Sequence, residues 1–230
     1  MCEIVTIFSL YGSFKIDRKI RRLLRYSINE PHGYGIIVIY GDNTVEVWKT
    51  MDKEKMKKKI RQLENKKLRF LLVHGRLATS GKINLVNCHP FILRNCITCH
   101  NGFIHDLNLN SVYCDTYLFS LIIDNLIERE EDIGSILELI EKNNIGLFVL
   151  FLPKKRKFYF LQSSFAWYRL AKRDNIVIIS KYIHGLCFRK IEVTIEDKKI
   201  CYRNIDSVLS PFLYNIKSVN DEERIIFDLR

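Results

Sequence analysis

The sequence has no apolar run long enough to cross a membrane, and no basic segment precedes its first apolar stretch. The first absence argues against a transmembrane helix, and the second makes the start, MCEIVTIFSLYG, a poor signal peptide. Internal repeats and low-complexity linkers are also lacking. We therefore expect residues 1–230 to form one soluble, cytoplasmic domain with a buried core.

The cysteine content and the net charge bear on the cellular compartment and on the kinds of partner the protein could bind. The chain has 7 cysteines, an odd number without a secretion signal, so free cytosolic thiols are expected. Its net charge of +11 could favour nucleic acid, an anionic membrane surface or an acidic partner. The excess is spread along the chain, apart from one concentrated run at Lys53–Lys67. Met56, Ile60 and Leu63 recur there at helical spacing, which predicts a surface helix with a solvated basic face. We expect neither a membrane nor a nucleic-acid partner.

Hydrophobic periodicity predicts a mixed fold. Helices are expected over 17–27, 53–67, 115–130 and 133–142, and a long irregular stretch over 75–110. A stretch of this length inside a compact domain is typical of a functional loop. The order of elements indicates an α+β domain in which helices cover the sheets. Strands are expected over 4–10, 35–40, 44–48, 68–73, 146–152, 157–162, 176–180, 188–194 and 198–203.

Cys2 is a candidate nucleophile because it directly follows the initiator methionine. Trimming of Met1, which a small second residue permits, would leave a thiol and a free α-amine on one residue. The thiolate is the reactive form of cysteine, and an α-amine with a pKa of about 7.7–8.0 can accept its proton near neutrality. Cys2 would then be both nucleophile and base. A cysteine at position 2 is also common by chance.

Five short motifs occur in order along the first half of the chain. They are Met1-Cys2, His74-Gly-Arg76-Leu-Ala-Thr79, Asn87-Cys-His89-Pro90, His100-Asn101-Gly102 and Asp115-Thr116. This series resembles the class II glutamine amidotransferase domain, with its initial Met-Cys, H-x-R-x-A-T, N-x-H-P, H-N-G and later acidic motif. Pro31–Ile36 resembles the entry of the small stand-alone branch, with one glycine absent. The resemblance covers residues 2 to about 120.

The resemblance implies a role for each matching residue. Asn101 and Gly102 correspond to the oxyanion hole that stabilises the charge developing when Cys2 attacks an amide. Arg76 corresponds to the residue that holds the substrate α-carboxylate, and Asp115 to the one that holds the α-ammonium. Thr79 and His89 are also expected at the substrate. Each has a structural alternative: His74, His89 and His100 can be core histidines, Asp115 a helix cap and Asn101-Gly102 a turn.

The resemblance further implies the four-layer αββα sandwich of the N-terminal-nucleophile hydrolases, without cofactor or metal. Leu77 and Ser80 stand where the hexosamine-phosphate synthase branch has Trp and His, and the chain ends at Arg230 without an acceptor domain. We therefore expect hydrolysis of glutamine or a γ-glutamyl compound through a Cys2 thioester. The alternatives are a glutaminase that delivers ammonia to a separate synthase subunit, and a non-catalytic basic binding module.

Two other motifs point to different chemistry. Cys96-Ile-Thr-Cys99-His100 matches the c-type haem attachment pattern, which would require export. Cys88, His89, Cys96, Cys99 and His100 together form a set of soft metal ligands, of which tetrahedral zinc would need four to converge. Cys88 and His89 are adjacent, and adjacent side chains in an extended segment point to opposite faces. A shared metal site is therefore not the expected outcome.

Overall fold

The computed structural model describes residues 2–105, 107, 112–164, 166–204 and 222–228. Over these residues the fold is mixed, with two antiparallel sheets and four α-helices. No described helix combines the length and apolar character needed to cross a membrane. The helices are α1 (Arg18–Ser27), α2 (Lys53–Glu64), α3 (Asp115–Glu128) and α4 (Ile133–Asn143), with a short 3-10 helix η1 (Pro153–Lys155).

The larger sheet has eight strands in the order β11-β9-β10-β1-β4-β2-β3-β14. Its first strand, β1, lies inside the sheet, with β10 on one side and β4 on the other. This placement fixes the residue that precedes β1, Cys2, against the rest of the sheet. The strands are β1 (Glu3–Ser9), β2 (Tyr34–Tyr40), β3 (Thr44–Thr50), β4 (Leu68–Gly75), β9 (Arg169–Arg173), β10 (Ile176–Ser180), β11 (Leu186–Cys187) and β14 (Glu222–Asp228).

The smaller sheet has six strands in the order β13-β12-β8-β7-β6-β5. β6 pairs with β7 over its whole length, with Gly102 opposite Gly146. The strands are β5 (Phe91–Ile92), β6 (Ile97–Ile104), β7 (Asn144–Leu152), β8 (Lys157–Gln162), β12 (Lys190–Ile195) and β13 (Ile200–Asn204).

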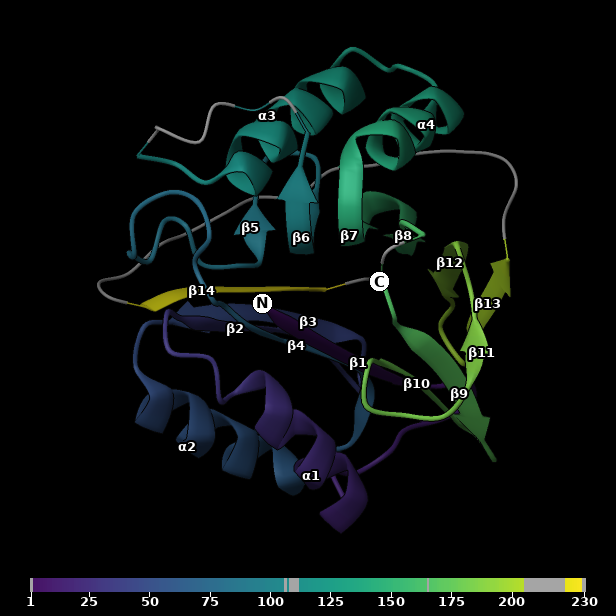
Figure 1. The fold of residues 1–230 in the computed structure, drawn as a ribbon. Coiled ribbons are helices and arrows are strands. Elements are labelled where there is room, and N and C mark those ends of the chain that lie inside the picture. Colours follow the sequence, from purple (N-terminus) through teal and green to yellow (C-terminus); the bar gives the residue numbers. More distant parts are fainter. Residues whose placement is uncertain (1, 106, 108–111, 165, 205–221, 229–230) are drawn as a thin grey trace.

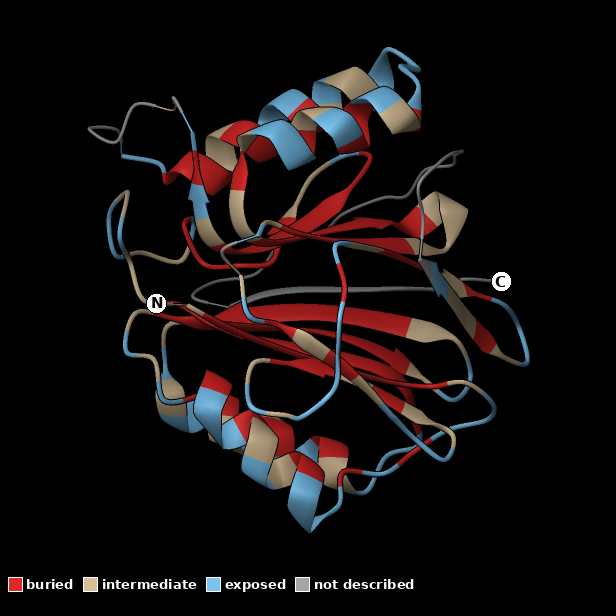
Figure 2. Ribbon diagram, turned by 45° about the vertical axis from the view of Figure 1, so that its right-hand side comes forward, coloured by how far each residue is buried: buried red, intermediate tan, exposed pale blue. Residues whose placement is uncertain are grey.

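The helices cover the outer faces of the two sheets (Figure 1). α1 and α2 pack on the larger sheet, and α3 and α4 pack on the smaller one. A third apolar core lies between the sheets, where Phe70 of β4 stacks on Phe158 of β8 with ring centroids 4.1 Å apart. The sheets are buried almost throughout, while the helices expose their outer sides (Figure 2).

Both helices on the larger sheet lie where the hydrophobic periodicity of the sequence predicted them. Met56, Ile60 and Leu63 of α2 are all buried, so the apolar stripe faces the sheet and the lysines face outward. Both helices begin at an aspartate whose side chain accepts backbone N–H groups of the first turn. Asp17 caps α1 through Ile20, and Asp52 caps α2 through Glu54 and Lys55.

The predicted irregular stretch over 75–110 is wrong in part, because β5 and β6 lie within it. β6 has the sequence ITCHNGFI, whose polar residues hide the alternation expected of a strand. Both ring nitrogens of its buried His100 are satisfied by hydrogen bonds with Thr116 and Asn144, at 2.9 and 3.0 Å. The predicted strands also do not include β9, β11 or β14.

Candidate active site

Cys2 lies at the entrance to β1, half-buried beside the chain that leaves β4. Its Sγ accepts the N–H of Leu77 and lies within hydrogen-bond distance of the Leu77 carbonyl, both at 3.3 Å. Burial raises the pKa of the thiol, and the backbone contact with Leu77 and the charge of Arg76 oppose that rise. A thiol in this environment needs a base to become nucleophilic.

Asn101 lies on β6 and meets a tyrosine from a distant part of the chain. Its Nδ2 donates to Tyr168 Oη at 2.6 Å, and the same oxygen accepts the N–H of Ile4 at 3.2 Å. Asn101 Oδ1 is buried without a partner among the described residues. Rotating the carboxamide by 180° would let Tyr168 donate to Oδ1 and would release Nδ2 as a donor. Tyr168 therefore sets the orientation of the Asn101 side chain.

Gly102 and Gly146 bring β6 and β7 together beside Asn101. Both have positive φ, 154° and 136°, which side chains rarely adopt. A Cβ on Gly102 would lie 1.8 Å from the Ile145 carbonyl oxygen, and one on Gly146 would lie 2.0 Å from that of Asn101. Only glycine fits at either position. The sequence motif identifies Gly102, whereas Gly146 is recognised only from the strand pairing.

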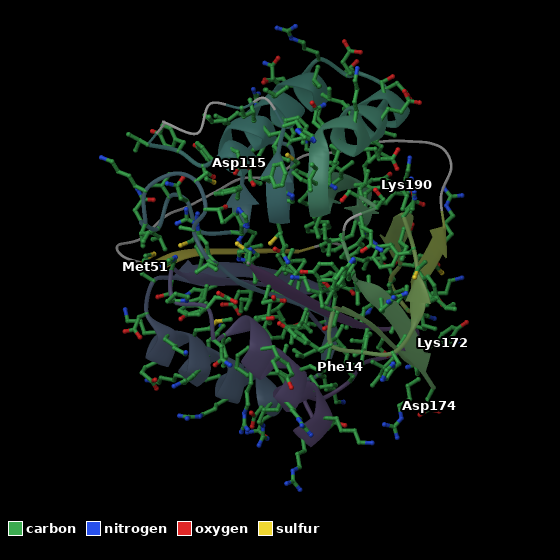
Figure 3. All side chains as sticks on the ribbon, in the orientation of Figure 1. Phe14, Met51, Asp115, Lys172, Asp174 and Lys190 are labelled. Carbon is green, nitrogen blue, oxygen red and sulfur yellow. The ribbon has the colours of Figure 1, made fainter. Side chains whose placement is uncertain are left out.

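Asp115 is the first residue of α3, at the end of the helix nearest the sheets (Figure 3). Its Oδ1 accepts from the Ser80 hydroxyl at 2.8 Å, and its Oδ2 accepts the N–H of Ile104 at 2.8 Å. The residue is buried, and no cation forms an ion pair with it among the described residues. Neutral donors thus fix a buried carboxyl group in a position where it can bind an ammonium group.

These residues meet at one cavity of about 640 Å³, a size that suits a small-molecule ligand. Five of the seven site residues expected from the sequence line it: Cys2, Thr79, Asn101, Gly102 and Asp115. Tyr168 and Lys181 line it too and were missed, because they follow the motifs by more than fifty residues. Lys181 Nζ is 3.2 Å from Glu3 Oε1. Much of the remaining wall is apolar, from Leu77, Phe103, Leu107, Ile145 and Trp167.

Arg76 and His89 do not line this cavity among the described residues. The Arg76 guanidinium is buried and donates to the carbonyls of Ser80 and Lys82, at 2.9 and 3.1 Å. It therefore holds the loop that carries Thr79 into the cavity wall. His89 is buried behind β6, with Nδ1 2.8 Å from His74 Nε2. The expected roles of both residues at the substrate stay predictions.

His74, His89 and His100 form a buried cluster behind the cavity. Burial lowers the pKa of His74 to about 3 and that of His100 to about 4, and it lowers the pKa of His89 well below its usual value. All three are therefore neutral at pH 7. His74 Nε2 also contacts the His100 carbonyl at 3.1 Å, which links the cluster to the strand that carries Asn101.

The cysteines and histidines that the sequence offered as soft metal ligands do not converge on one site. Cys99 lies in the core between the sheets, whereas Cys96 lies in the core beneath α3 and α4, so the C-x-x-C pattern faces two different layers. Cys88 Sγ packs against Met51 Sδ at 3.2 Å. Among the described residues the one group that could hold an ion is His74, His89 and Cys99, with ligand atoms within 4.8 Å of one another. Two of these atoms already share a hydrogen bond between the imidazoles.

No protein-family model and no curated protein sequence matches the chain. Solved structures that match include a glutamine phosphoribosylpyrophosphate amidotransferase from B. subtilis, complexed with ADP and GMP. It is 10% identical with a TM-score of 0.49, and the match covers 90% of this chain and 50% of that one. A glutamine aminotransferase class-II domain protein from Silicibacter pomeroyi is 15% identical with a TM-score of 0.46, covering 87% of this chain and 98% of that one. The chain thus spans half the length of the B. subtilis enzyme. TM-scores below 0.5 do not assign a family.

Proposed function

We propose that this protein hydrolyses the side-chain amide of glutamine, or of a γ-glutamyl compound, with Cys2 as an N-terminal nucleophile. The observation that carries the proposal is the meeting of Cys2, Asn101, Gly102, Thr79 and Asp115 at one cavity. These residues come from four separate stretches of the chain, and the sequence pattern had selected them for one reaction. A set of unrelated structural residues would have no reason to share a wall.

The proposed reaction has two steps. The α-amine of Cys2, free after removal of Met1, takes the thiol proton, and Sγ attacks the amide carbon. Asn101 and Gly102 stabilise the oxyanion, the C–N bond breaks, and the protonated α-amine gives its proton to the leaving ammonia or amine. A thioester between Cys2 and the γ-glutamyl group remains. Water, deprotonated by the same amine, attacks the thioester carbon and releases the γ-carboxylate and the Cys2 thiol.

The fold supports this assignment. Helices lie outside both sheets and a shared core lies between them, which is the arrangement expected of a four-layer αββα sandwich of the N-terminal-nucleophile hydrolases. We propose that residues 1–230 form one such class II amidotransferase domain, resembling the stand-alone amidohydrolase branch and acting in the cytoplasm. Delivery of ammonia to a separate synthase subunit remains the alternative use of the same site.

Release of glutamate from glutamine, γ-glutamyl peptides and γ-glutamyl thiols tests the proposal. Wild-type protein should release glutamate from at least one of them, and Cys2→Ser should release almost none while keeping its melting temperature. A diazo-ketone analogue of glutamine should add one adduct to the wild type and none to Cys2→Ser. Cys187→Ser is the matched control, because Cys187 is exposed and lies outside the cavity. Full activity in Cys2→Ser, or in protein whose intact mass retains Met1, would rule out the mechanism.

A further inference from the structure

Charge is divided unevenly between the two helical layers. Residues 15–25 hold six basic and one acidic side chain, and residues 52–67 hold eight basic and three acidic ones. The layer of α1 and α2 therefore carries +10 of the chain's net +11. Residues 115–143, which form α3 and α4, hold eight acidic and two basic side chains, a net charge of −6. The two layers lie on opposite sides of the molecule (Figure 1), so its electric field is strongly polarised.

Most cations of the positive layer are exposed and are not used by the fold. The layer's ion pairs are Arg21–Glu64 at 2.7 Å, Lys57–Glu54 at 2.5 Å and Lys59–Glu46 at 2.7 Å. Nine further exposed cations take part in none of these ion pairs, and we call them the basic face. They are Lys15, Arg18, Lys19, Arg22, Arg25, Lys58, Arg61, Lys66 and Lys67.

The basic face offers no apolar surface for insertion into a bilayer. The apolar residues of α1 and α2 point into the sheet, where Ile20, Leu24, Met56 and Ile60 are buried. Tyr26 is the one large hydrophobic side chain that either helix exposes. Helices that bind in the membrane interface instead present an apolar stripe to the lipid. The surface therefore suits a polyanion in solution better than a membrane.

A groove of about 830 Å³ runs beside α1 at the edge of the basic face. Lys15, Lys19, Arg22 and Arg173 line it, together with Asp17, which caps α1, and Asp174. Tyr26 and Tyr182 also line the groove. Their rings stack on each other with centroids 4.2 Å apart and planes 21° apart, and the side chains are 38% and 42% exposed. An exposed aromatic pair beside a row of cations can stack an unpaired base.

We propose that the basic face and this groove bind single-stranded nucleic acid, with phosphates on the cations and a base on the tyrosine pair. Backbone phosphates supply the affinity in non-specific binding, and base stacking favours a single strand over a duplex. The site is separate from the cavity at Cys2 and does not depend on the proposed hydrolase activity. The expectation that the excess charge is spread along the chain with one concentrated run is therefore corrected, because two stretches, 15–25 and 52–67, hold +10 of the net +11 and the fold places them side by side. The proposal also reverses the expectation of no nucleic-acid partner.

Fluorescence anisotropy with a labelled oligothymidylate of about 20 nucleotides tests the proposal. Near physiological salt we expect a Kd of about 1–100 μM, weakening as salt rises from about 50 to 200 mM. The variant Lys19→Gln/Arg22→Gln/Arg25→Gln should bind more weakly, and its salt slope should be smaller by about 2. The matched control Arg129→Gln/Arg189→Gln/Lys198→Gln loses the same charge from exposed positions outside the basic face and should keep the slope. Equal losses in both variants would overturn the proposal.

A variant of the tyrosine pair tests whether the ligand is a single strand or another polyanion. Tyr26→Leu should weaken oligothymidylate binding at least about fivefold and leave the melting temperature nearly unchanged. The proposal is overturned if a duplex of equal length or phosphatidylserine vesicles bind as tightly as the single strand. It is also overturned if no binding occurs at the lowest salt, or if sedimentation there shows the protein associating with itself through its acidic layer.

Discussion

Asn101 provides the sharpest test of the chemistry at the scale of single residues. The substrate carbonyl is neutral at first and carries full negative charge only in the tetrahedral intermediate. A donor aimed at that oxygen therefore acts on the transition state. Asn101→Ala should lower kcat by about 10²–10³ and leave KM nearly unchanged, as measured by glutamate release. A variant with a lower melting temperature but full kcat would show that Asn101 only supports β6.

Tyr168→Phe supplies the matched comparison for Asn101→Ala. The substitution keeps the ring and removes the hydroxyl that holds the carboxamide at 2.6 Å. It should lower kcat less than Asn101→Ala does, because the amide remains but loses its fixed orientation. The double variant should be no slower than Asn101→Ala alone, since both changes act through one group. If the losses in kcat of the two single variants were additive in the double variant, Tyr168 would not act through Asn101.

The group that binds the substrate carboxylate can be located by a pair of variants. Arg76 is expected there from the motif, yet its guanidinium is occupied by two backbone carbonyls, whereas Lys181 lines the cavity. We expect Lys181→Met to raise KM for the preferred substrate more than Arg76→Lys does, with kcat nearly retained in Lys181→Met. A group that holds the carboxylate in both ground and transition states affects KM first. The reverse order would return the role to Arg76.

At the residue scale the motifs predicted part of the cavity wall: five of the seven expected residues line it, whereas Arg76 and His89 do not. Cys2, Thr79, Asn101, Gly102 and Asp115 sit in motifs whose residue types and order led us to expect them at one site. Tyr168 and Lys181 carry no local signal, because a tyrosine and a lysine beside strands are ordinary. They reach the cavity only through the pairing of β10 with β1 and β9 with β10.

At the scale of elements, the close pairing of β6 with β7 at Gly102 and Gly146 determines the geometry of the site. Gly146→Ala should destabilise the protein by roughly 1–3 kcal/mol or more, because the new Cβ meets the Asn101 carbonyl oxygen in a backbone conformation unfavourable to alanine. It should also lower kcat, since the displaced backbone carries Asn101 and Gly102. Urea unfolding and glutamate release on the same sample measure both effects.

Gly41→Ala is the control for Gly146→Ala. An added Cβ at Gly41 would come no closer than 3.3 Å, to the side chain of Lys67, so a small adjustment accommodates it. Stability and kcat should change little. If Gly146→Ala behaved like Gly41→Ala, the close approach of the two strands would not be needed for the site.

Elements with clear periodicity were predicted well, and short or polar ones were not. The apolar stripes placed α1, α2, α3 and α4 to within two or three residues at each end. β6 was not predicted because buried polar groups such as the His100 ring are satisfied by distant partners, Thr116 and Asn144, which no local pattern reveals. β14 is an edge strand of the larger sheet and pairs with β3, so that the pairing joins segments far apart in sequence.

The buried histidine cluster predicts how the whole molecule responds to acid. His74, His89 and His100 have pKa values below their usual value in the folded state, so below about pH 6.5 the unfolded chain binds more protons than the folded one. Stability should therefore be fully present above pH 6.5 and should fall as the pH drops from there toward 4. Three such groups give a slope of up to about 4 kcal/mol per pH unit.

Urea unfolding at pH 7.5, 6 and 5 measures that slope. His89→Gln should reduce it by about 1.4 kcal/mol per pH unit, because one fewer buried imidazole must stay neutral. A flat stability between pH 7 and 5 would contradict the burial of the cluster. The sequence contained these histidines within its motifs but could not say that they touch one another, since His74 and His100 come from different sheets.

The interior position of β1 also determines when, during synthesis of the chain, its two neighbouring strands become available for pairing. One of its neighbours, β4, ends at Gly75, but the other, β10, ends at Ser180. At about 5–20 residues per second, roughly 5–20 s separate the synthesis of these two strands on the ribosome. One side of β1 stays open during that interval, while the start of the chain is already accessible. The peptidase that removes Met1, as the proposed chemistry requires, can therefore act on the nascent chain before the sheet closes around Cys2.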